Sequence, residues 1–208
     1  MPAVSDEGSL RHLLRRLERE VDEWRREPLK AVVARARVQR PLRRRQFHTF
    51  GERSIVHRPV WLYGADHIAI GSDVMVLEGC WLAVERQAWG ARDVVMRLGD
   101  HVGIRVYCTL SAAHEVTLED HVVLGSSVTI IDSDHTWQSG APSVMASPLK
   151  TAPVRVGRGT WIGDRAAVLA GSDIGEQCII GANSVVKGPI PDHSIAVGSP
   201  AKVVGSTR

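Results

Sequence analysis

Aliphatic residues recur every six positions along most of this chain. Each hexad opens on an aliphatic residue, Gly often follows, and the fifth position holds Val, Cys, Thr, Ala or Ser. The hexads begin at Ile70, Val76, Leu98, Ile104, Leu118, Leu124, Val156, Ile162, Val168, Ile174 and Ile180. The period predicts a short strand that buries one large and one small side chain, followed by a turn in which Gly tolerates unusual backbone angles.

Three such hexads close one triangular coil, and stacked coils pair their strands in parallel. The predicted fold class is therefore an all-β solenoid. The three cysteines, Cys80, Cys108 and Cys178, all occupy the small fifth position. We expect them to be reduced core residues, because they have no CxxC spacing.

The hexad register breaks at two main places. Residues 88–97 are inserted between two hexads, and the longest break runs from about 131 to 153. The second segment is polar and contains Pro142 and Pro148, so we expect it to protrude from the solenoid as a loop. A long loop in a regular solenoid is usually functional or disordered.

Residues 1–50 lie outside the repeat, which gives two regions, 1–50 and 51–208. Helical spacing is shown by Leu10, Leu13, Leu14, Leu17, Val21 and Trp24, with Ser5 as N-cap and Pro28 as stop. We expect this helix to cap the first coil, and contact with a membrane surface is the alternative. The arginines that follow are Arg35, Arg37, Arg40, Arg43, Arg44 and Arg45; they form a solvated face or contact phosphate or an acidic glycan.

Composition narrows the class of protein. Among 208 residues, 44% are hydrophobic but only 5% are aromatic, which suits a narrow core. The net charge of +3 and a pI of about 9.0 do not demand a nucleic-acid partner. The sequence has no transmembrane run and no signal-peptide apolar region, so a cytoplasmic location is expected.

The C-terminal third carries a specific likeness. Segments 161–171, 174–176, 180–186 and 195–202, which include Trp-Ile-Gly-Asp and Gly-Ser-Pro-Ala-Lys, resemble the hexapeptide-repeat acetyltransferases. The likeness covers roughly residues 60–205. It extends equally to the maltose, galactoside and xenobiotic O-acetyltransferases and to the sugar O-acetyltransferases of surface-polysaccharide synthesis. The resemblance implies a left-handed parallel β-helix, a homotrimer with active sites between subunits, and acetyl-CoA as co-substrate.

The implied activity is transfer of acetyl from acetyl-CoA to a hydroxyl of a sugar or similar small acceptor. This reaction needs a base that takes the acceptor proton as the oxygen attacks the thioester directly. His135, at the start of the long loop, matches the family's catalytic histidine. Asp132 and Asp134 flank it and would orient the imidazole or contact the acceptor; a solvated loop carboxylate is the alternative for both.

One departure concerns the acceptor. The maltose and galactoside enzymes carry asparagines in the coil before the catalytic histidine, where this chain has Arg105 and Tyr107. These two residues are the acceptor-binding candidates, and the acceptor is expected to differ from the family's simple galactosides.

The resemblance also places the CoA site in the C-terminal coils. Trp161 would line the cleft, and backbone at Gly163, Asp164, Gly181 and Ala182 would contact the pantetheine arm. Lys187 and Lys202 would meet the nucleotide phosphates as point charges. For Trp161 the alternative is a subunit contact, and for the lysines it is simple solvation.

Three other functions remain open. An N-acetyltransferase of an amino sugar or nucleotide-linked sugar needs a similar base. A zinc carbonic anhydrase on the same β-helix needs three converging histidines, whereas His101 and His121 are expected to be exposed turn residues, and His114 has no assignment. No metal site is therefore predicted. A non-catalytic hexapeptide scaffold would bind no CoA.

Overall fold

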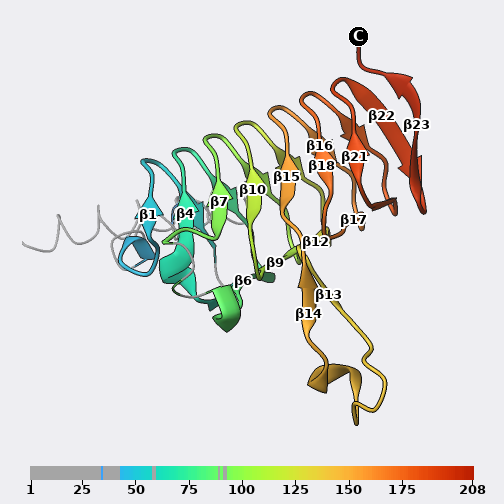
Figure 1. Cartoon of the computed structure of the whole chain (residues 1–208). Coiled ribbons are helices and arrows are strands. Elements are labelled where there is room, and N and C mark those ends of the chain that lie inside the picture. The colour runs from blue at the N-terminus through green and yellow to red at the C-terminus, as the bar shows by residue number, and fades with distance from the viewer. Residues whose placement is uncertain (1–33, 35–42, 58–59, 89, 91–92) are drawn as a thin grey trace, which may run out of the picture.

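The computed structural model describes residues 34, 43–57, 60–88, 90 and 93–208 of the chain (Figure 1). The predicted N-terminal helix and Arg35, Arg37 and Arg40 lie outside the described residues. Arg43, at the start of the described part, is buried and donates from Nη1 to Gln46 Oε1 at 3.0 Å.

The described chain winds into a triangular parallel β-helix with three sheets. Sheet A consists of β1 (Thr49–Phe50), β4 (Ile68–Ile70), β7 (Met96–Leu98), β10 (Val116–Leu118), β15 (Val154–Val156), β18 (Asp173–Ile174) and β21 (Pro189–Ile190). Sheet B consists of β2 (Ile55–Val56), β5 (Met75–Val76), β8 (Gly103–Ile104), β11 (Val123–Leu124), β16 (Trp161–Ile162), β19 (Ile179–Ile180), β22 (Ser194–Gly198) and β23 (Ala201–Ser206). Sheet C consists of β3 (Val60–Tyr63), β6 (Cys80–Val84), β9 (Thr109–Ala112), β12 (Thr129–Ile131), β17 (Ala167–Val168) and β20 (Val185–Val186).

Every coil adds one strand to each sheet, as Figure 1 shows along the length of the solenoid. The parallel sheets and the small helix content of the described residues confirm the all-β solenoid and are consistent with the left-handed β-helix that the resemblance implies. The C-terminal end closes with the antiparallel pair β22–β23. Three short 3-10 helices complete the described elements: η1 (Ala65–His67), η2 (Arg86–Ala88) and η3 (Val144–Ala146). None of the described helices is long and apolar enough to cross a membrane.

The hexad pattern maps onto the core as predicted. The aliphatic residue that opens each of the eleven hexads is at most 1% exposed, and the small residue at each fifth position is equally buried. Each large side chain removed from water contributes about 1.5–3 kcal/mol to folding. The narrow triangle has no room for two large residues per hexad, so a small fifth residue is required.

Polar residues in the small position bind carbonyl groups of the next coil. Thr160 Oγ1 donates to the Gly175 oxygen at 2.9 Å, and Cys108 Sγ donates to the Gly125 oxygen at 3.1 Å. A buried carbonyl without a donor would cost free energy, and these side chains supply one. The prediction that the cysteines are buried core residues is confirmed, since all three are free and buried.

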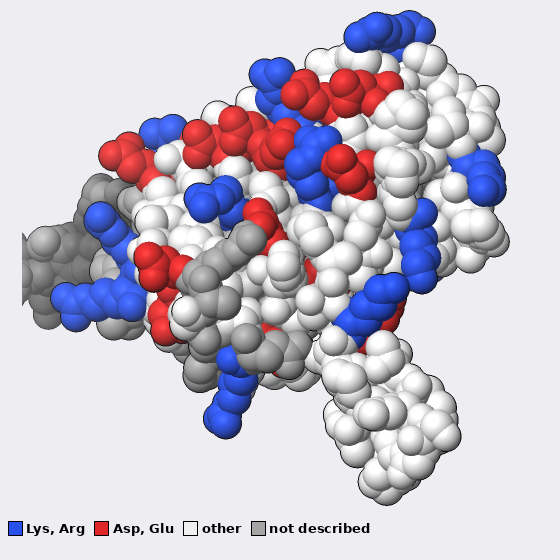
Figure 2. All heavy atoms as spheres, in the orientation of Figure 1, with Lys and Arg blue, Asp and Glu red and all other residues white. Residues whose placement is uncertain are grey.

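One of the three outer faces of the solenoid carries charged residues along its outward row. Register pairing aligns an outward row on sheet A made of Thr49, Ala69, Arg97, Thr117, Arg155, Asp173 and Pro189. Arg155 bonds Glu119 Oε1 at 3.0 Å and Asp173 Oδ1 at 2.6 Å, and Figure 2 shows acidic and basic groups gathered over this face. Sheet A therefore presents a charged surface.

Sheet B presents an uncharged outward row made of Ile55, Met75, Gly103, Val123, Trp161, Ile179 and Ile195. The corresponding row on sheet C is Trp61, Trp81, Thr109, Thr129, Ala167 and Val185, also without charge. Contiguous exposed apolar surface of this kind marks a site of interaction.

The predicted loop near 131–153 does protrude, as an arm whose first and last strands pair to form one antiparallel hairpin. Its strands are β13 (Ser133–His135) and β14 (Leu149–Thr151), with η3 near the far end (Figure 1). No charged residue occurs from His135 to Leu149, and the arm is correspondingly white in Figure 2. The arm leaves the solenoid between β12 of sheet C and β15 of sheet A.

Candidate active site

His135 is the last residue of β13, opposite Leu149 of β14. Its side chain is exposed, and no described residue forms a hydrogen bond or ion pair with it. An imidazole in this state keeps both ring nitrogens available, one as a proton acceptor. His135 therefore meets the accessibility that a general base requires.

Asp132 is buried, whereas the sequence predicts a carboxylate that orients the imidazole, contacts the acceptor or faces solvent. Its side chain is fully buried, and its two oxygens accept backbone N–H bonds of 2.7 Å each from Ala113, His114 and Glu115. A carboxylate committed to three amides is held in place by them. Asp132 thus anchors the root of the arm to the turn before β10, and no bond joins it to His135.

Asp134 is half-exposed and points toward the C-terminal coils. Its Oδ2 lies 4.0 Å from Nζ of Lys187, which follows β20. The structure therefore brings Asp134, a candidate for orienting the imidazole or contacting the acceptor, close to Lys187, a candidate for binding the nucleotide phosphates. Figure 2 shows basic side chains near the base of the arm.

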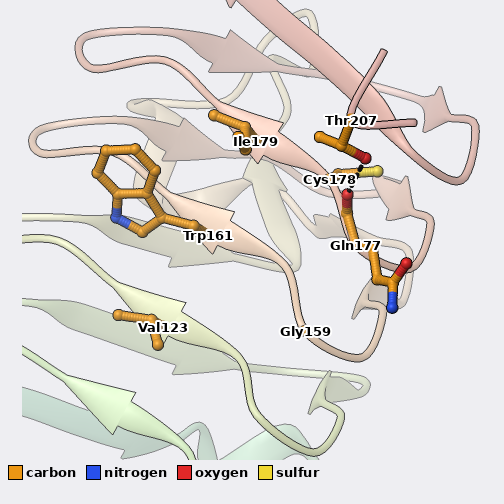
Figure 3. Close-up of a pocket in the computed structure, with 7 residues that line it drawn as sticks. All are labelled: Val123, Gly159, Trp161, Gln177, Cys178, Ile179 and Thr207. Carbon is orange, nitrogen blue, oxygen red and sulfur yellow. Dashed lines mark hydrogen bonds between the residues drawn. The ribbon is translucent and has the colours of Figure 1, made fainter.

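Trp161 lies on the outer face of sheet B, in a shallow groove of about 520 Å³. Figure 3 shows its indole between Val123 and Ile179 of the neighbouring coils, with Gln177 and Thr207 at one end of the groove. Thr207 Oγ1 donates to the Gln177 carbonyl oxygen at 2.8 Å, which fixes the C-terminal segment to this end. Half of the Trp161 surface is exposed, so the ring is available to a ligand or to another chain.

The turns after β16 and β19 hold the backbone positions expected to contact CoA. Gly163 is required there, because a Cβ would lie 2.6 Å from the Ala182 nitrogen. In the same column of turns, the Ser126 N–H is capped by Asp164 Oδ1 at 2.9 Å. The next two amides, those of Asp164 and Ala182, have no acceptor among the described residues. These two N–H groups can serve an external acceptor such as an amide carbonyl.

The remaining CoA candidates lie around these turns. Gly181 donates its N–H to the Ala196 oxygen at 2.9 Å and so belongs to the ladder between coils. Lys202 is an exposed residue of β23, opposite Val197. No described contact joins Lys202 to Lys187.

Arg105 and Tyr107 occupy the turn between β8 and β9. Both are exposed, and Tyr107 has a left-handed backbone with φ of 63°. The Tyr107 ring lies against Gly79 of the preceding coil, where any Cβ would overlap it. No described contact joins these two residues to His135.

The structure shows where the other candidate histidines lie. His101 and His121 are exposed turn residues, as expected, and their rings stack in parallel at 4.6 Å. No group of three or more His, Cys, Asp or Glu side chains suited to a metal occurs in the described part of the chain. His114, which the sequence could not assign, is exposed beside the root of the arm, where Asp132 holds its backbone.

Residues 153–188 match the family model described as bacterial transferase hexapeptide, six repeats. This segment of the chain therefore carries the hexapeptide repeat of bacterial transferases, and the resemblance is confirmed.

The relatives are named as acetyltransferases. A Mycobacterium tuberculosis acetyltransferase is 35% identical over 127 residues, which are 61% of this chain and 42% of that protein. The lipopolysaccharide biosynthesis O-acetyl transferase WbbJ of Escherichia coli K12 is 32% identical over 119 residues, 53% of this chain and 60% of its own. The matched region thus spans about half the length of these two relatives.

Solved structures share the fold. AntD, an N-acyltransferase from Bacillus cereus in complex with dTDP and coenzyme A, superposes with a TM-score of 0.69 at 20% identity, covering 82% of this chain and 89% of its own. A maltose O-acetyltransferase from Clostridium difficile 630 superposes with a TM-score of 0.57 at 20% identity, covering 82% and 75%. At these identities the likeness establishes the β-helix alone.

Proposed function

We propose that this protein transfers an acetyl group from acetyl-CoA to a hydroxyl of a sugar or similar small acceptor, with His135 as general base. The observation that carries the proposal is the exposed imidazole of His135, which has no hydrogen-bond partner among the described residues and lies at the start of a stretch without charge, residues 135–149. The names of the relatives, which include an O-acetyl transferase, support the same chemistry.

The reaction is a direct transfer. His135 accepts the proton of the acceptor hydroxyl as its oxygen attacks the thioester carbonyl. The tetrahedral intermediate collapses with loss of the CoA sulfur, which takes the proton back from the imidazolium. No acyl-enzyme is needed, and no Ser, Thr or Cys side chain of the described arm forms a hydrogen bond with His135 that would activate it as a nucleophile.

Acetyl-CoA would lie along the turns of the C-terminal coils. The open N–H groups of Asp164 and Ala182 are suited to the amide carbonyls of the pantetheine arm. Trp161 would provide an apolar wall, and Lys187 and Lys202 would meet phosphates. Gly163 and Gly181 allow close approach of backbone at these turns.

The complete site would form between copies of the chain. His135 is on the arm, whereas Trp161 is on sheet B, and no described contact joins them. The uncharged row of sheet B is suited to burial against a second copy, while the charged face of sheet A is suited to solvent. A cyclic homotrimer would bring the arm of one copy alongside sheet B of the next, because a heterologous contact related by a three-fold rotation closes into a ring.

The test measures CoA release from acetyl-CoA with a panel of sugars and amino sugars. Wild type is compared with His135→Ala, and His114→Ala is the matched control because it also removes an exposed imidazole beside the arm. We expect turnover with one acceptor class that falls at least about 100-fold in His135→Ala and stays near wild type in His114→Ala. Acetyl-CoA binding should persist in both variants.

The alternatives give distinct outcomes. Turnover restricted to amino sugars would indicate N-acetylation, and AntD, an N-acyltransferase, shares this fold. Loss of activity in His114→Ala but not in His135→Ala would show that the base is misassigned. Failure of wild type to bind acetyl-CoA would favour a non-catalytic scaffold. Catalysis of CO2 hydration would favour the carbonic anhydrase hypothesis.

A further inference from the structure

Two tryptophans form an exposed ladder on sheet C. Trp61 of β3 and Trp81 of β6 are direct register partners, and their side chains are 55% and 52% exposed. Large aromatic side chains rarely remain so exposed without a partner, because each could bury a large apolar area. Neither ring belongs to the site described above.

A third ring borders the ladder. Tyr107 is 64% exposed at the turn before β9, and its ring lies against Gly79, two residues before Trp81. Gly79 has φ of 77° and cannot be replaced without displacing the ring. Tyr107 is therefore held in the turn that joins sheets B and C, two residues before Thr109 of the outward row.

The same outward row continues with hydroxyl groups toward the arm. Trp81 is aligned with Thr109, and Thr109 is aligned with Thr129 of β12, the strand that leads into the arm. Among the described residues neither threonine hydroxyl has a hydrogen-bond partner. With strands about 4.8 Å apart, the row from Trp61 to Thr129 is about 14 Å long.

The chemistry of this row is suited to one kind of ligand. Flat aromatic faces stack on the C–H faces of sugar rings, and free hydroxyls exchange hydrogen bonds with sugar hydroxyls. The row contains no charged side chain, so a neutral ligand is favoured over an acidic one. A lipid surface would not use the threonines, and the row includes Thr129 of β12, the strand that precedes the arm with His135, the proposed base.

We propose that Trp61, Trp81 and Tyr107, with Thr109 and Thr129, form a binding track for a neutral oligosaccharide chain. The inference rests on the proposed function for its role: the track holds remote sugar units of the acceptor, while the unit to be acetylated lies by the arm. The acceptor would then be an oligosaccharide several sugars long rather than a single sugar.

The test separates binding from turnover. Maltooligosaccharides and chitooligosaccharides of one to six sugars are titrated into the full-length protein without acetyl-CoA, by calorimetry and tryptophan fluorescence. We expect affinity to rise with chain length in wild type. The double variant Trp61→Ala, Trp81→Ala should lose roughly tenfold or more for the longest chains and leave single sugars unchanged.

Two further variants keep the result specific. Met145→Ala removes a side chain that is 73% exposed in η3, near the far end of the arm and outside the track, and should stay within about twofold of wild type. Trp81→Phe retains a stacking surface and should recover part of the affinity that the double variant loses. Thermal unfolding of each variant checks that the fold is retained.

The outcomes of this test and of the activity assay differ. Length-dependent binding without any acetyl transfer would support the track and overturn the proposed function. Acetyl transfer without length-dependent binding of either series would overturn the track alone. If the double variant changes the oligomeric state but not oligosaccharide affinity, the rings are a subunit contact and the track is wrong.

Discussion

Asp132 Oδ2 accepts a hydrogen bond of 2.7 Å from the backbone N–H of His114, and this bond ties the arm to the preceding coil. The same carboxylate also holds the amides of Ala113 and Glu115. The arm carries the proposed base, and its root is therefore fixed by a buried anion rather than by apolar packing alone. Orientation of a base by its scaffold is what allows its proton transfer to be efficient.

Replacing Asp132 by Asn should destabilise the fold. An amide has one acceptor oxygen, so its NH2 group would face backbone N–H groups that the carboxylate now binds. We expect a loss of about 3 kcal/mol in the free energy of unfolding, measured by urea denaturation. Asp134→Asn is the control, since its half-exposed carboxylate lies 4.0 Å from Lys187 and should cost less than about 1 kcal/mol. Equal stability of the two variants would contradict the structural role of Asp132.

The fold could be predicted from the sequence because the hexad period specifies local geometry. Each opening aliphatic residue and each small fifth residue is buried, and this pattern needs no knowledge of distant contacts. The place of the long loop could also be predicted, since Pro142 and Pro148 interrupt the period. The hairpin at its root could not, because pairing of His135 with Leu149 depends on register across the loop.

Less of the candidate site could be predicted from the sequence, because its contacts join residues of different coils. The partners of Asp132 are amides 17 to 19 residues earlier, and a neighbouring coil supplies them. The position of Asp132, three residues before His135, predicts a role in orienting the imidazole, whereas its burial and its bonds to three amides give it a structural role. Likewise, the ladder of Trp61 and Trp81 depends on which residues of successive coils align, and Trp61 precedes Ile70, where the first hexad of the repeat begins.

Close packing between coils should make two nearby glycines respond differently to alanine. A Cβ at Gly99 would lie 2.7 Å from the Asp120 nitrogen, whereas the nearest atom to a Cβ at Gly103 is 3.9 Å away. Gly99→Ala should lose about 2 kcal/mol or more of stability, because backbone cannot yield as a side chain can. Gly103→Ala should stay within about 0.5 kcal/mol. Thermal unfolding that ranks the two in the opposite order would contradict the described stacking of coils.

The uncharged row of sheet B gives a prediction for assembly. Val123 is 41% exposed in the isolated chain, so Val123→Glu should be tolerated by the fold. In a trimer that buries this face, the carboxylate would lose its hydration, and the assembly should dissociate. Sedimentation velocity measures the change, with Thr117→Glu on charged sheet A as the matched control. Retention of the oligomer by Val123→Glu would show that sheet B is not the contact face.

The cysteines should be chemically silent in the folded protein. The neighbouring Cys80 and burial raise the pKa of the Cys108 thiol, whereas the neighbouring Cys108 lowers the pKa of Cys80, so blocked access must protect Cys80. All three cysteines are buried, and reagent access is blocked as well. We expect a disulfide reagent such as DTNB to react with no thiol at pH 8 until guanidinium unfolds the chain, when all three react. Ser139→Cys, on the exposed part of the arm, is the positive control and should add one fast-reacting thiol; fast reaction of the wild type would contradict the buried placement of the cysteines.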